Sequence, residues 1–398
     1  MFEQERQLLE RAGHRVIIFD RSNREVDAYR GVKRLILAQK AIWNQEAHRS
    51  FSRMLRAERP DVVHVHNFWV MISPSIFSAC REEGVPVVQT LHNYRLLCPA
   101  GTFFRSGRIC EECPQHGLWR SVQHACYRDS RAQTAAKAVM LAVHRYRQTW
   151  QREVDGNIVL TEFARKKFID GGLAPEKIFI KPNFVYPDPL AGNGHAPRVE
   201  DGNYALFAGR LSPEKRVSTL LNAWTRLPRR IPLVIIGGGQ QRDELEQEAI
   251  RENLSSVVFK GTLTREQTVA AIKRARFLIF SSEWYETFGL TMVEAFASGV
   301  PVICSRLGAM EEIVDDGRTG FHFTPGDGQD LAEKVDWAWR NPERMRLMGE
   351  EARREYESKY TAEKNYPRLM EIYQHAIASV ASSSQPVTAP AIPVGEVK

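Results

Sequence analysis

Glu286 and Glu294 lie in Ser281–Gly299, a stretch in which a polar turn gives way to a helix. The pattern predicts a strand ending at Phe280 and a helix opening at 288–290 that carries Glu294. The first turn of a helix presents unpaired N–H groups and a partial positive charge, so it attracts phosphate. Carboxylates on either side can accept hydrogen bonds from sugar hydroxyls. The stretch therefore predicts a site for a diphosphate with a sugar at each end.

Fixed positive charge and a glycine-rich turn follow two strands that come earlier in the chain. Leu206–Gly209 reads as a strand, and Arg210 and Lys215 after it can bind phosphate oxygens. Leu233–Ile236 is another strand, and three glycines follow it, where a ligand can approach the backbone. Two acidic residues separated by eight positions are common by chance in a chain with 48 acidic residues. The pair Glu286 and Glu294 therefore indicates a site only together with these cations and glycines.

The segments GRLSPEK, IIGGG and ETFGLTMVE together resemble the nucleotide-sugar half of the retaining glycosyltransferases of family 4 (GT4), which have the two-domain GT-B fold. The resemblance extends from about Arg11 to Tyr373. It places the family's E-x7-E signature on Glu286 and Glu294. It likewise places the family's diphosphate-binding Arg and Lys on Arg210 and Lys215.

The resemblance implies two sets of site residues. The catalytic set is His92, Glu286, Arg210 and Lys215. The donor-binding set is Gly209, Gly237, Gly238, Leu263, Phe288, Gly289, Leu290 and Glu294. Leu263 follows the strand Val257–Phe259, where related enzymes hold the nucleotide base, mainly through the backbone. Related enzymes need no metal, so we assign no metal ligand to the site and expect no cofactor beyond the nucleoside-diphosphate sugar.

Two histidines stand at predicted strand ends in the first half. His92 follows the strand Pro86–Leu91, and His66 ends the strand that begins at Asp61. Strand, helix and strand in this order indicate parallel pairing, and ligands of parallel sheets gather at the carboxyl ends of the strands. A lone histidine is more often structural. The resemblance makes His92 the active-site histidine that contacts the transferred sugar, and His66 is the second candidate.

A chain of 398 residues suits two domains, and its alternating strands and helices predict an α/β protein. The resemblance implies two Rossmann-like domains that face each other across a cleft. The expected parts are a first domain at 1–188 with a cysteine-containing helical excursion at 99–152, a linker at 189–201, a second domain at 202–365, a helix crossing back at 366–380, and a tail at 381–398. We expect the tail to be disordered because it is rich in Ser, Pro, Ala and Val and lacks periodicity.

The beginning of the chain departs from the family pattern. Phe2–Arg11 reads as a helix and Val16–Phe19 as a strand, whereas a domain of this family begins with a strand and a glycine-rich loop ahead of such a helix. We therefore expect the first domain to be incomplete by about 15–25 residues before Met1. Because that loop often touches the donor phosphates and the acceptor, its loss would impair activity.

Four of the six cysteines lie close together in the sequence: Cys98, Cys110, Cys113 and Cys126. The Cys-x2-Cys core is compatible with zinc, although the outer spacings fit no standard finger. His92, His116 and His124 are nearby alternative ligands. Buried thiols without a ligand are the other interpretation. Disulfides are not expected in a reducing cytoplasm.

The net charge of +7 is concentrated in the first half, where residues 1–190 hold 29 Lys and Arg against 20 Asp and Glu. This excess suits an anionic membrane, an acidic acceptor or nucleic acid, and it also suits a solvated Arg-rich surface. The sequence contains neither an apolar run of 18 residues nor a secretory leader. We therefore expect a cytoplasmic protein, peripheral on the inner face of the membrane.

These features together predict the transfer of a hexosyl group, with retention, from a nucleoside-diphosphate sugar to a glycan or lipid-linked acceptor in polysaccharide biosynthesis. One alternative is a sugar-nucleotide epimerase or hydrolase with the same two-domain fold, which would turn over the donor without an acceptor. The other is a basic nucleic-acid-binding protein. That alternative predicts a steep salt dependence and leaves Glu286 and Glu294 without a role, so we expect no nucleic-acid partner.

Overall fold

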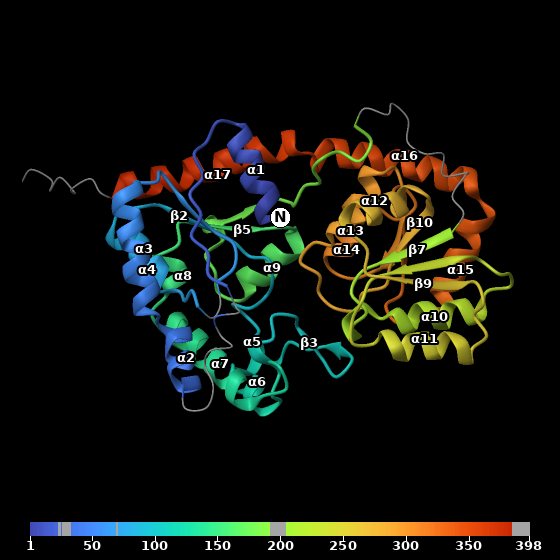
Figure 1. Ribbon diagram of the computed structural model, residues 1–398, viewed down its shortest axis with the longest axis horizontal. Coiled ribbons are helices and arrows are strands. Elements are labelled where there is room, and N and C mark those ends of the chain that lie inside the picture. Colours follow the sequence, from blue (N-terminus) through green and yellow to red (C-terminus); the bar gives the residue numbers. More distant parts are fainter. Residues whose placement is uncertain (23–24, 26–32, 69–70, 192–203, 384–398) are drawn as a thin grey trace, which may run out of the picture.

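The computed structural model describes residues 1–22, 25, 33–68, 71–191 and 204–383. Two lobes lie side by side, and each contains a parallel sheet with helices packed around it (Figure 1). The first lobe is coloured blue to green, and the second is yellow to orange (Figure 1). The predicted α/β class with parallel sheets is confirmed.

The first lobe is built on a four-stranded sheet in the order β1-β2-β5-β6. Its strands are β1 (Val63–Val65), β2 (Val87–Thr90), β5 (Gly156–Val159) and β6 (Ile178–Ile180). Its helices are α1 (Phe2–Arg11), α2 (Lys33–Ile42), α3 (Gln45–Glu58), α4 (Ser75–Glu82), α7 (Arg131–Tyr146), α8 (Thr149–Arg152) and α9 (Glu162–Asp170). Strands β2 and β5 are buried along their whole length, as a sheet covered on both faces requires.

A small separate unit interrupts the first lobe between β2 and α7. It contains the hairpin strands β3 (Phe104–Arg105) and β4 (Arg108–Ile109), followed by the short helices α5 (Glu112–His116) and α6 (Trp119–Gln123). All four clustered cysteines fall within residues 98–130, which we call the cysteine module. Apart from Cys98, this module lies within the excursion predicted at 99–152.

The second lobe contains a six-stranded parallel sheet in the order β12-β11-β10-β7-β8-β9. Its strands are β7 (Tyr204–Ala208), β8 (Leu233–Ile236), β9 (Val257–Gly261), β10 (Ala275–Phe280), β11 (Val302–Ser305) and β12 (Gly320–Phe323). Its helices are α10 (Val217–Arg226), α11 (Arg242–Arg251), α12 (Arg265–Lys273), α13 (Leu290–Ala297), α14 (Ala309–Ile313), α15 (Gly328–Arg340) and α16 (Pro342–Lys359).

The strand order of the second sheet reverses between β7 and β10. The chain runs outward through β8 and β9, then returns to β10 on the other side of β7 and continues to β11 and β12. Helices that follow strands on either side of such a point leave a crevice at the carboxyl ends, where ligands of open α/β sheets bind. The segments after β7 and β10 are the ones that carry the predicted site.

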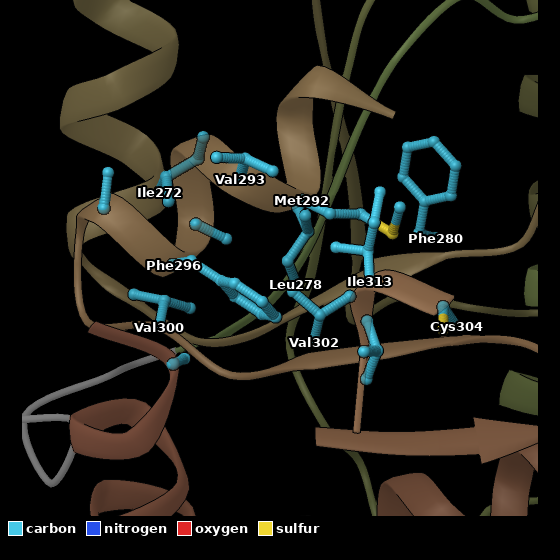
Figure 2. Close-up of a cluster of buried hydrophobic side chains, with 14 of the residues drawn as sticks. Ile272, Leu278, Phe280, Met292, Val293, Phe296, Val300, Val302, Cys304 and Ile313 are labelled. Carbon is cyan, nitrogen blue, oxygen red and sulfur yellow. The ribbon is translucent and has the colours of Figure 1, made fainter. Parts of the chain in front are cut away.

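A hydrophobic cluster holds α13 against the carboxyl end of this sheet. Figure 2 shows Met292 and Phe296 of the helix packed on Leu278 and Phe280 of β10 and on Val302 of β11. Helix α13 is apolar on nearly every side, so it is buried instead of lying on the surface. Since truncating a buried phenylalanine to alanine costs about 3–5 kcal/mol, Phe296→Ala would release the helix.

The last helix, α17 (Ala362–Ser383), runs back along the first lobe (Figure 1). Leu369 and Ile372 pack against Val88 of β2 and Ile158 of β5, while the preceding helix α16 packs on the second lobe. Helix α17 therefore joins the two lobes. It extends through residues 381–383, which the sequence assigned to a disordered tail.

Some sequence predictions meet no matching element. The strand predicted at Val16–Phe19 is wrong, since residues 14–20 have no regular structure. Phe19 instead packs on Phe51 of α3, with ring centroids 4.8 Å apart. Most of the predicted linker and residues 384–398 of the predicted tail lie outside the described residues. The segment predicted to precede Met1 remains a prediction. Among the described helices, none has the length and apolar character to cross a bilayer.

Candidate active site

Glu286 lies in the turn after β10 and is 6% exposed. Its Oε1 atom accepts three hydrogen bonds, from Lys215 Nζ at 2.5 Å, Trp284 Nε1 at 2.7 Å and Ser282 Oγ at 2.8 Å. In the part of the chain that the structure describes, no donor is bound to Oε2. The carboxylate is thus held rigidly by one oxygen and keeps the other for a hydroxyl group. Lys215 was predicted as a phosphate ligand, and the structure pairs it with Glu286.

The glycines after β7 and β8 are required by the packing of two loops. Gly237 has a φ of +139°, and a Cβ there would lie 1.8 Å from the carbonyl oxygen of Gly209. A Cβ on Gly238 would lie 2.7 Å from Thr262 Oγ1. Leu211 N donates to Gly238 O at 2.9 Å. Backbone contact between loops therefore explains these glycines, and it places Gly209, Gly237 and Gly238 on one edge of the sheet.

Helix α13 begins at the same edge. Gly289 precedes it with a φ of +89°, a left-handed conformation that suits glycine, and no described side chain caps the helix. The first-turn N–H groups therefore face the crevice side of β10 without a capping oxygen. Leu290 is the first helical residue. It lies within the predicted opening at 288–290. The side chain of Phe288 is 2% exposed and packs in the core, so only the backbone of Phe288 is available.

The three remaining predicted site residues, Arg210, Glu294 and Leu263, differ in their surroundings. The side chain of Arg210 is 72% exposed and has a long 3.5 Å contact to Glu214. Glu294 is 8% exposed, and Arg265 Nε lies 3.4 Å from its Oε1. Burial raises the pKa of Glu294, and the charge of Arg265 opposes that shift. Leu263 follows β9 and packs on the core beneath this edge.

The Glu286 turn is docked on the first lobe. Thr287 Oγ1 donates to the carbonyl oxygen of His92 at 3.1 Å. The hydroxyl of Tyr94, a fully buried residue, donates to the carbonyl oxygen of Glu286 at 3.4 Å. The structure therefore brings His92, predicted from a strand end in the first domain, next to a turn that comes nearly 200 residues later. The predicted site is assembled across the lobes.

His92 is hydrogen-bonded to the second candidate, His66. His66 Nδ1 and His92 Nε2 are 2.9 Å apart, and the rings are stacked with centroids separated by 5.2 Å. Burial lowers the pKa of His92 to about 4 and also holds that of His66 far below its usual value. Both rings are therefore neutral near pH 7, and one nitrogen of the pair donates to the other.

A buried ion pair between Glu5 and Lys181 lies next to these histidines. Glu5 of α1 is 3% exposed and lies 3.4 Å from Lys181 Nζ and 3.1 Å from His64 Nδ1. Burial opposes ionisation of Glu5, but the charges of Lys181 and His64 outweigh it and hold its pKa well below the usual value. The rings of His64 and His66 are 4.3 Å apart. A continuous series of side-chain contacts therefore leads from Glu5 through His64 and His66 to His92 at the crevice.

Sequence reasoning did not identify Glu5, Lys181 or Arg265. A weak signal existed for Glu5, because it shares a helical face with Phe2 and Leu9, and an acid on an apolar face needs a partner. Nothing in the sequence near Lys181 or Arg265 indicates which acid each one meets. Trp284 and Ser282 sit inside the motif, yet their hydrogen bonds to Glu286 depend on the fold of the turn.

A pocket opens beside His92 in the first lobe. It is lined by the ends of β1 and β2 and by α7, with Gln89, Lys137 and Met140 among its residues. Gln89 is 3% exposed, and its Oε1 atom has no hydrogen-bond partner among the described residues. A buried carbonyl oxygen without a donor is costly, so a ligand donor in this pocket would satisfy it.

Two family models match the chain in succession. Residues 4–188 match the model of Glycosyltransferase Family 4, and residues 195–355 match that of Glycosyl transferases group 1. Together they take in both lobes. The chain belongs to the family 4 glycosyltransferases.

Among curated relatives of this family 4 chain, the O-antigen chain mannosyltransferase C of Escherichia coli is 31% identical over 179 residues, covering 44% of this chain and 48% of that protein. A glycogen synthase of Mycobacterium tuberculosis is 30% identical over 287 residues, covering 70% of this chain and 60% of that protein. The chain thus matches about half to three fifths of these relatives' lengths.

Solved structures give the same fold. A glycosyltransferase from Rickettsia africae superposes with a TM-score of 0.63 at 14% identity, covering 93% of this chain and 87% of that chain. HepE of Anabaena, crystallised with UDP-glucose, gives a TM-score of 0.56 at 20% identity, covering 89% of each chain. The GT-B fold predicted for this family member is therefore confirmed.

Proposed function

We propose that the protein is a retaining hexosyltransferase that uses a nucleoside-diphosphate sugar and a glycan or lipid-linked acceptor in polysaccharide biosynthesis. The observation that carries this proposal is the crevice between the segments after β7 and β10. There, Lys215 and Glu286 are in contact, the uncapped start of α13 is close by in the fold, and His92 approaches from the first lobe. Relatives named as mannosyltransferases and as a glycogen synthase support the same chemistry.

Positive charge in the crevice would stabilise the departing diphosphate. When the bond between the sugar's anomeric carbon and the diphosphate oxygen breaks, negative charge builds on the diphosphate. Arg210, Lys215 and the N-terminus of α13 face that charge, and such preorganised groups are commonly the largest catalytic contribution. These groups supply the charge that a metal ion supplies in other enzymes, so the proposed reaction requires no metal. The exposed side chain of Arg210 is free to close on the diphosphate.

Two acids would hold the sugars. Glu294, which is paired with Arg265, would accept hydrogen bonds from the ribose. Glu286 would orient the hexose through its open oxygen and favour positive charge at the anomeric carbon. Three donors on its other oxygen, including Lys215, draw negative charge away from the carboxylate and make it a weaker nucleophile. Transfer would therefore proceed without a glycosyl-enzyme intermediate, unlike double displacement between paired carboxylates.

His66 would act as a positioning residue for His92. Their shared hydrogen bond fixes the orientation of the His92 ring and occupies its Nε2 atom. A neutral His92 can contact a sugar hydroxyl without adding a charge that would repel an oxocarbenium-like transition state. The pocket lined by Gln89 and Lys137 lies on the same side and would receive the acceptor.

A donor screen followed by product analysis tests the proposal. Thermal-shift measurements with UDP, GDP, ADP and dTDP should show stabilisation by one of them, because a ligand that binds only the native state raises the melting temperature. The matching sugar nucleotide should then be consumed rapidly only when an acceptor is present. Rapid turnover of the donor alone would favour an epimerase or hydrolase, and stabilisation by none of the four would contradict the proposal.

We also propose that the protein works in the cytoplasm with its first lobe against an anionic membrane. The exposed side chains of Val139, Val143 and Tyr146 follow the helical spacing that puts them on one side of α7. Helices α2, α6 and α7 gather at one end of the basic first lobe (Figure 1). An apolar stripe in a basic surface suits a lipid interface. Sedimentation with vesicles of anionic but not neutral lipid tests this placement.

A further inference from the structure

The cysteine module contains four free cysteines that the proposed reaction does not use. Cys98 precedes the β3–β4 hairpin, Cys110 and Cys113 stand on either side of the start of α5, and Cys126 follows α6. Cys98 and Cys113 are buried, and the other two are half-buried. Their burial does not come from one apolar core, since Cys113 belongs to none of the hydrophobic clusters of the described residues.

Lys137 of α7 contacts both ends of the module. Its Nζ atom donates to the carbonyl oxygen of Pro99 at 3.2 Å and lies 3.3 Å from the ring centroid of Tyr127. Pro99 directly follows Cys98, and Tyr127 directly follows Cys126. One buried lysine side chain thus holds the residue that follows the first cysteine beside the residue that follows the last.

Glu112 forms ion pairs that connect the middle of the module to its other segments. Glu112 lies between Cys110 and Cys113 in the sequence, and its carboxylate is paired with Arg105 of the hairpin, with Arg120 of α6 at 3.0 Å and with His124 at 3.4 Å. His124 is two residues before Cys126. The segments that carry three of the cysteines therefore meet at one carboxylate.

The thiols are close enough to affect one another's ionisation. Burial raises the pKa of Cys113 to about 12, and the thiols of Cys98, Cys126 and Cys110 add to the shift. Burial and the Cys98 thiol likewise raise the pKa of Cys126 to about 11, although Arg105 opposes the shift.

The module has little else to hold its backbone. Of the nine non-glycine residues with positive φ in the described chain, five lie in this short unit: Phe103, Ser106, Ala125, Arg128 and Asp129. Left-handed backbone at such residues is unfavourable and persists only where the surroundings enforce it. Two-residue strands and five-residue helices bury too little surface to do so alone, and small units of this kind are commonly held by disulfides or a metal.

We propose that Cys98, Cys110, Cys113 and Cys126 bind one structural zinc ion as four thiolates. Tetrahedral zinc with Zn–S bonds of about 2.3 Å would draw the sulfur atoms to roughly 3.8 Å from one another. No three of the four sulfur atoms lie within 4.8 Å of one another, because the one such group of ligand atoms in the described residues is Glu5, His64 and His66. Zinc binding would therefore rotate the cysteine side chains inward, and Arg105 would offset part of the negative charge of the site.

The tighter group around Glu5 already holds a cationic side chain, although Glu5 Oε1 has no hydrogen-bond partner among the described residues. Lys181 already neutralises the carboxylate of Glu5. Both ring nitrogens of His64 are occupied, Nδ1 by Tyr373 Oη at 2.8 Å and Nε2 by Thr90 Oγ1 at 2.7 Å. A cation there would have to displace these partners, whereas the four thiols have no comparable ion pair to lose.

The proposed zinc would stiffen the bridge between the module and the second lobe. The carbonyl oxygen of Gly107, at the tip of the hairpin, accepts a hydrogen bond from Arg216 at 2.5 Å, and Glu111 accepts one from Tyr285 Oη at 2.8 Å. Arg216 follows Lys215, and Tyr285 precedes Glu286. Figure 1 shows β3 reaching toward the second lobe. The module therefore contacts both segments of the candidate active site.

Metal analysis of the purified full chain tests the proposal. After dialysis against a weak chelator under reducing conditions, mass spectrometry of the metal content should find about one zinc per chain. Cys113→Ser should lose the zinc. Cys304→Ala, which removes a thiol from the core of the second lobe, should keep it. Cobalt in place of zinc should give the intense sulfur-to-metal absorption of a tetrahedral thiolate site.

Reversible metal removal keeps the test decisive if Cys113→Ser does not fold. Stripping zinc from the wild-type chain with a mercurial and a chelator should lower the melting temperature by about 5 °C or more, and reduction followed by zinc should restore it. Less than about a tenth of a zinc per chain after reconstitution under reducing conditions would overturn the proposal. Zinc that survives Cys113→Ser but is lost in His64→Ala would also overturn it, by placing the metal at Glu5.

Discussion

The two lobes contribute to the candidate site in different ways. In the second lobe, the site residues follow neighbouring strands of one sheet, and their contacts stay within a short stretch of sequence, such as the 71 residues between Lys215 and Glu286. In the first lobe, His92 depends on His66, His64 and a pair between Glu5 and Lys181 that spans 176 residues. We infer that changes to the site residues of the second lobe affect chemistry alone, whereas changes to those of the first lobe affect stability as well.

Glu286→Gln should have the largest effect. The amide keeps an oxygen for Lys215, Trp284 and Ser282 but loses the negative charge that favours the transition state. We expect kcat to fall by about 1000-fold with little change in melting temperature. Steady-state kinetics and thermal unfolding check this outcome. Glu311→Gln, an exposed acid of the same lobe, should match wild type, and an active Glu286→Gln enzyme would remove Glu286 from the site.

Glu5→Ala should have the largest effect on stability. It leaves Lys181 buried without its partner, which costs about 3 kcal/mol or more in the free energy of unfolding, measured with urea. Combining Glu5→Leu with Lys181→Met should recover most of that loss, because neither charge is then buried alone. Glu3→Ala on the exposed side of α1 is the control. Equal stabilities of Glu5→Ala and Glu3→Ala would refute the difference proposed between the lobes.

His66→Ala should lower kcat about tenfold, the equivalent of one lost hydrogen bond, because His92 is no longer oriented. The dissociation constant for the nucleoside diphosphate should not change, since that ligand binds in the second lobe. His66→Asn, whose amide can reach where Nδ1 lies, should restore part of the rate. A purely structural role would instead lower the melting temperature without this rescue.

Acid should weaken the first lobe. Burial holds the pKa of His92 at about 4, whereas an exposed histidine titrates near pH 6.5. Between these values the unfolded chain binds a proton that the folded chain does not, so the free energy of unfolding falls as the pH drops through this range. His92→Gln should flatten that part of the stability profile measured with urea. An unchanged slope would mean that His92 is not buried in its neutral form.

Arg210→Ala should have the smallest effect. Its side chain is exposed and has only a long contact to Glu214, so its removal leaves the fold intact. We expect the nucleoside diphosphate to bind about tenfold more weakly by calorimetry, as the loss of one charge-assisted hydrogen bond predicts. Arg226→Ala, on the same lobe, is the matched control. An unchanged dissociation constant would exclude Arg210 from the diphosphate site.

The same difference between the lobes explains what the sequence could predict. Glu286, Glu294 and the glycines are visible because each lies in a short motif at a strand end, and parallel pairing then brings the strand ends together. The place of His92 follows from the same rule. The buried pair of Glu5 and Lys181 that supports His92 could not be predicted, because no local sequence pattern links residue 5 with residue 181. The strand predicted at Val16–Phe19 fails for a related reason, since an apolar run can pack through its side chains without a strand to pair with.

The central claim is that a nucleoside diphosphate binds between the segments after β7 and β10. Hydrogen exchange measured by mass spectrometry, with and without the diphosphate that gives the largest thermal shift, tests it most directly. We predict slower exchange in peptides covering 209–216 and 286–294, with little change over α11 and α15. Protection confined to the first lobe, or none in these two segments, would contradict the account.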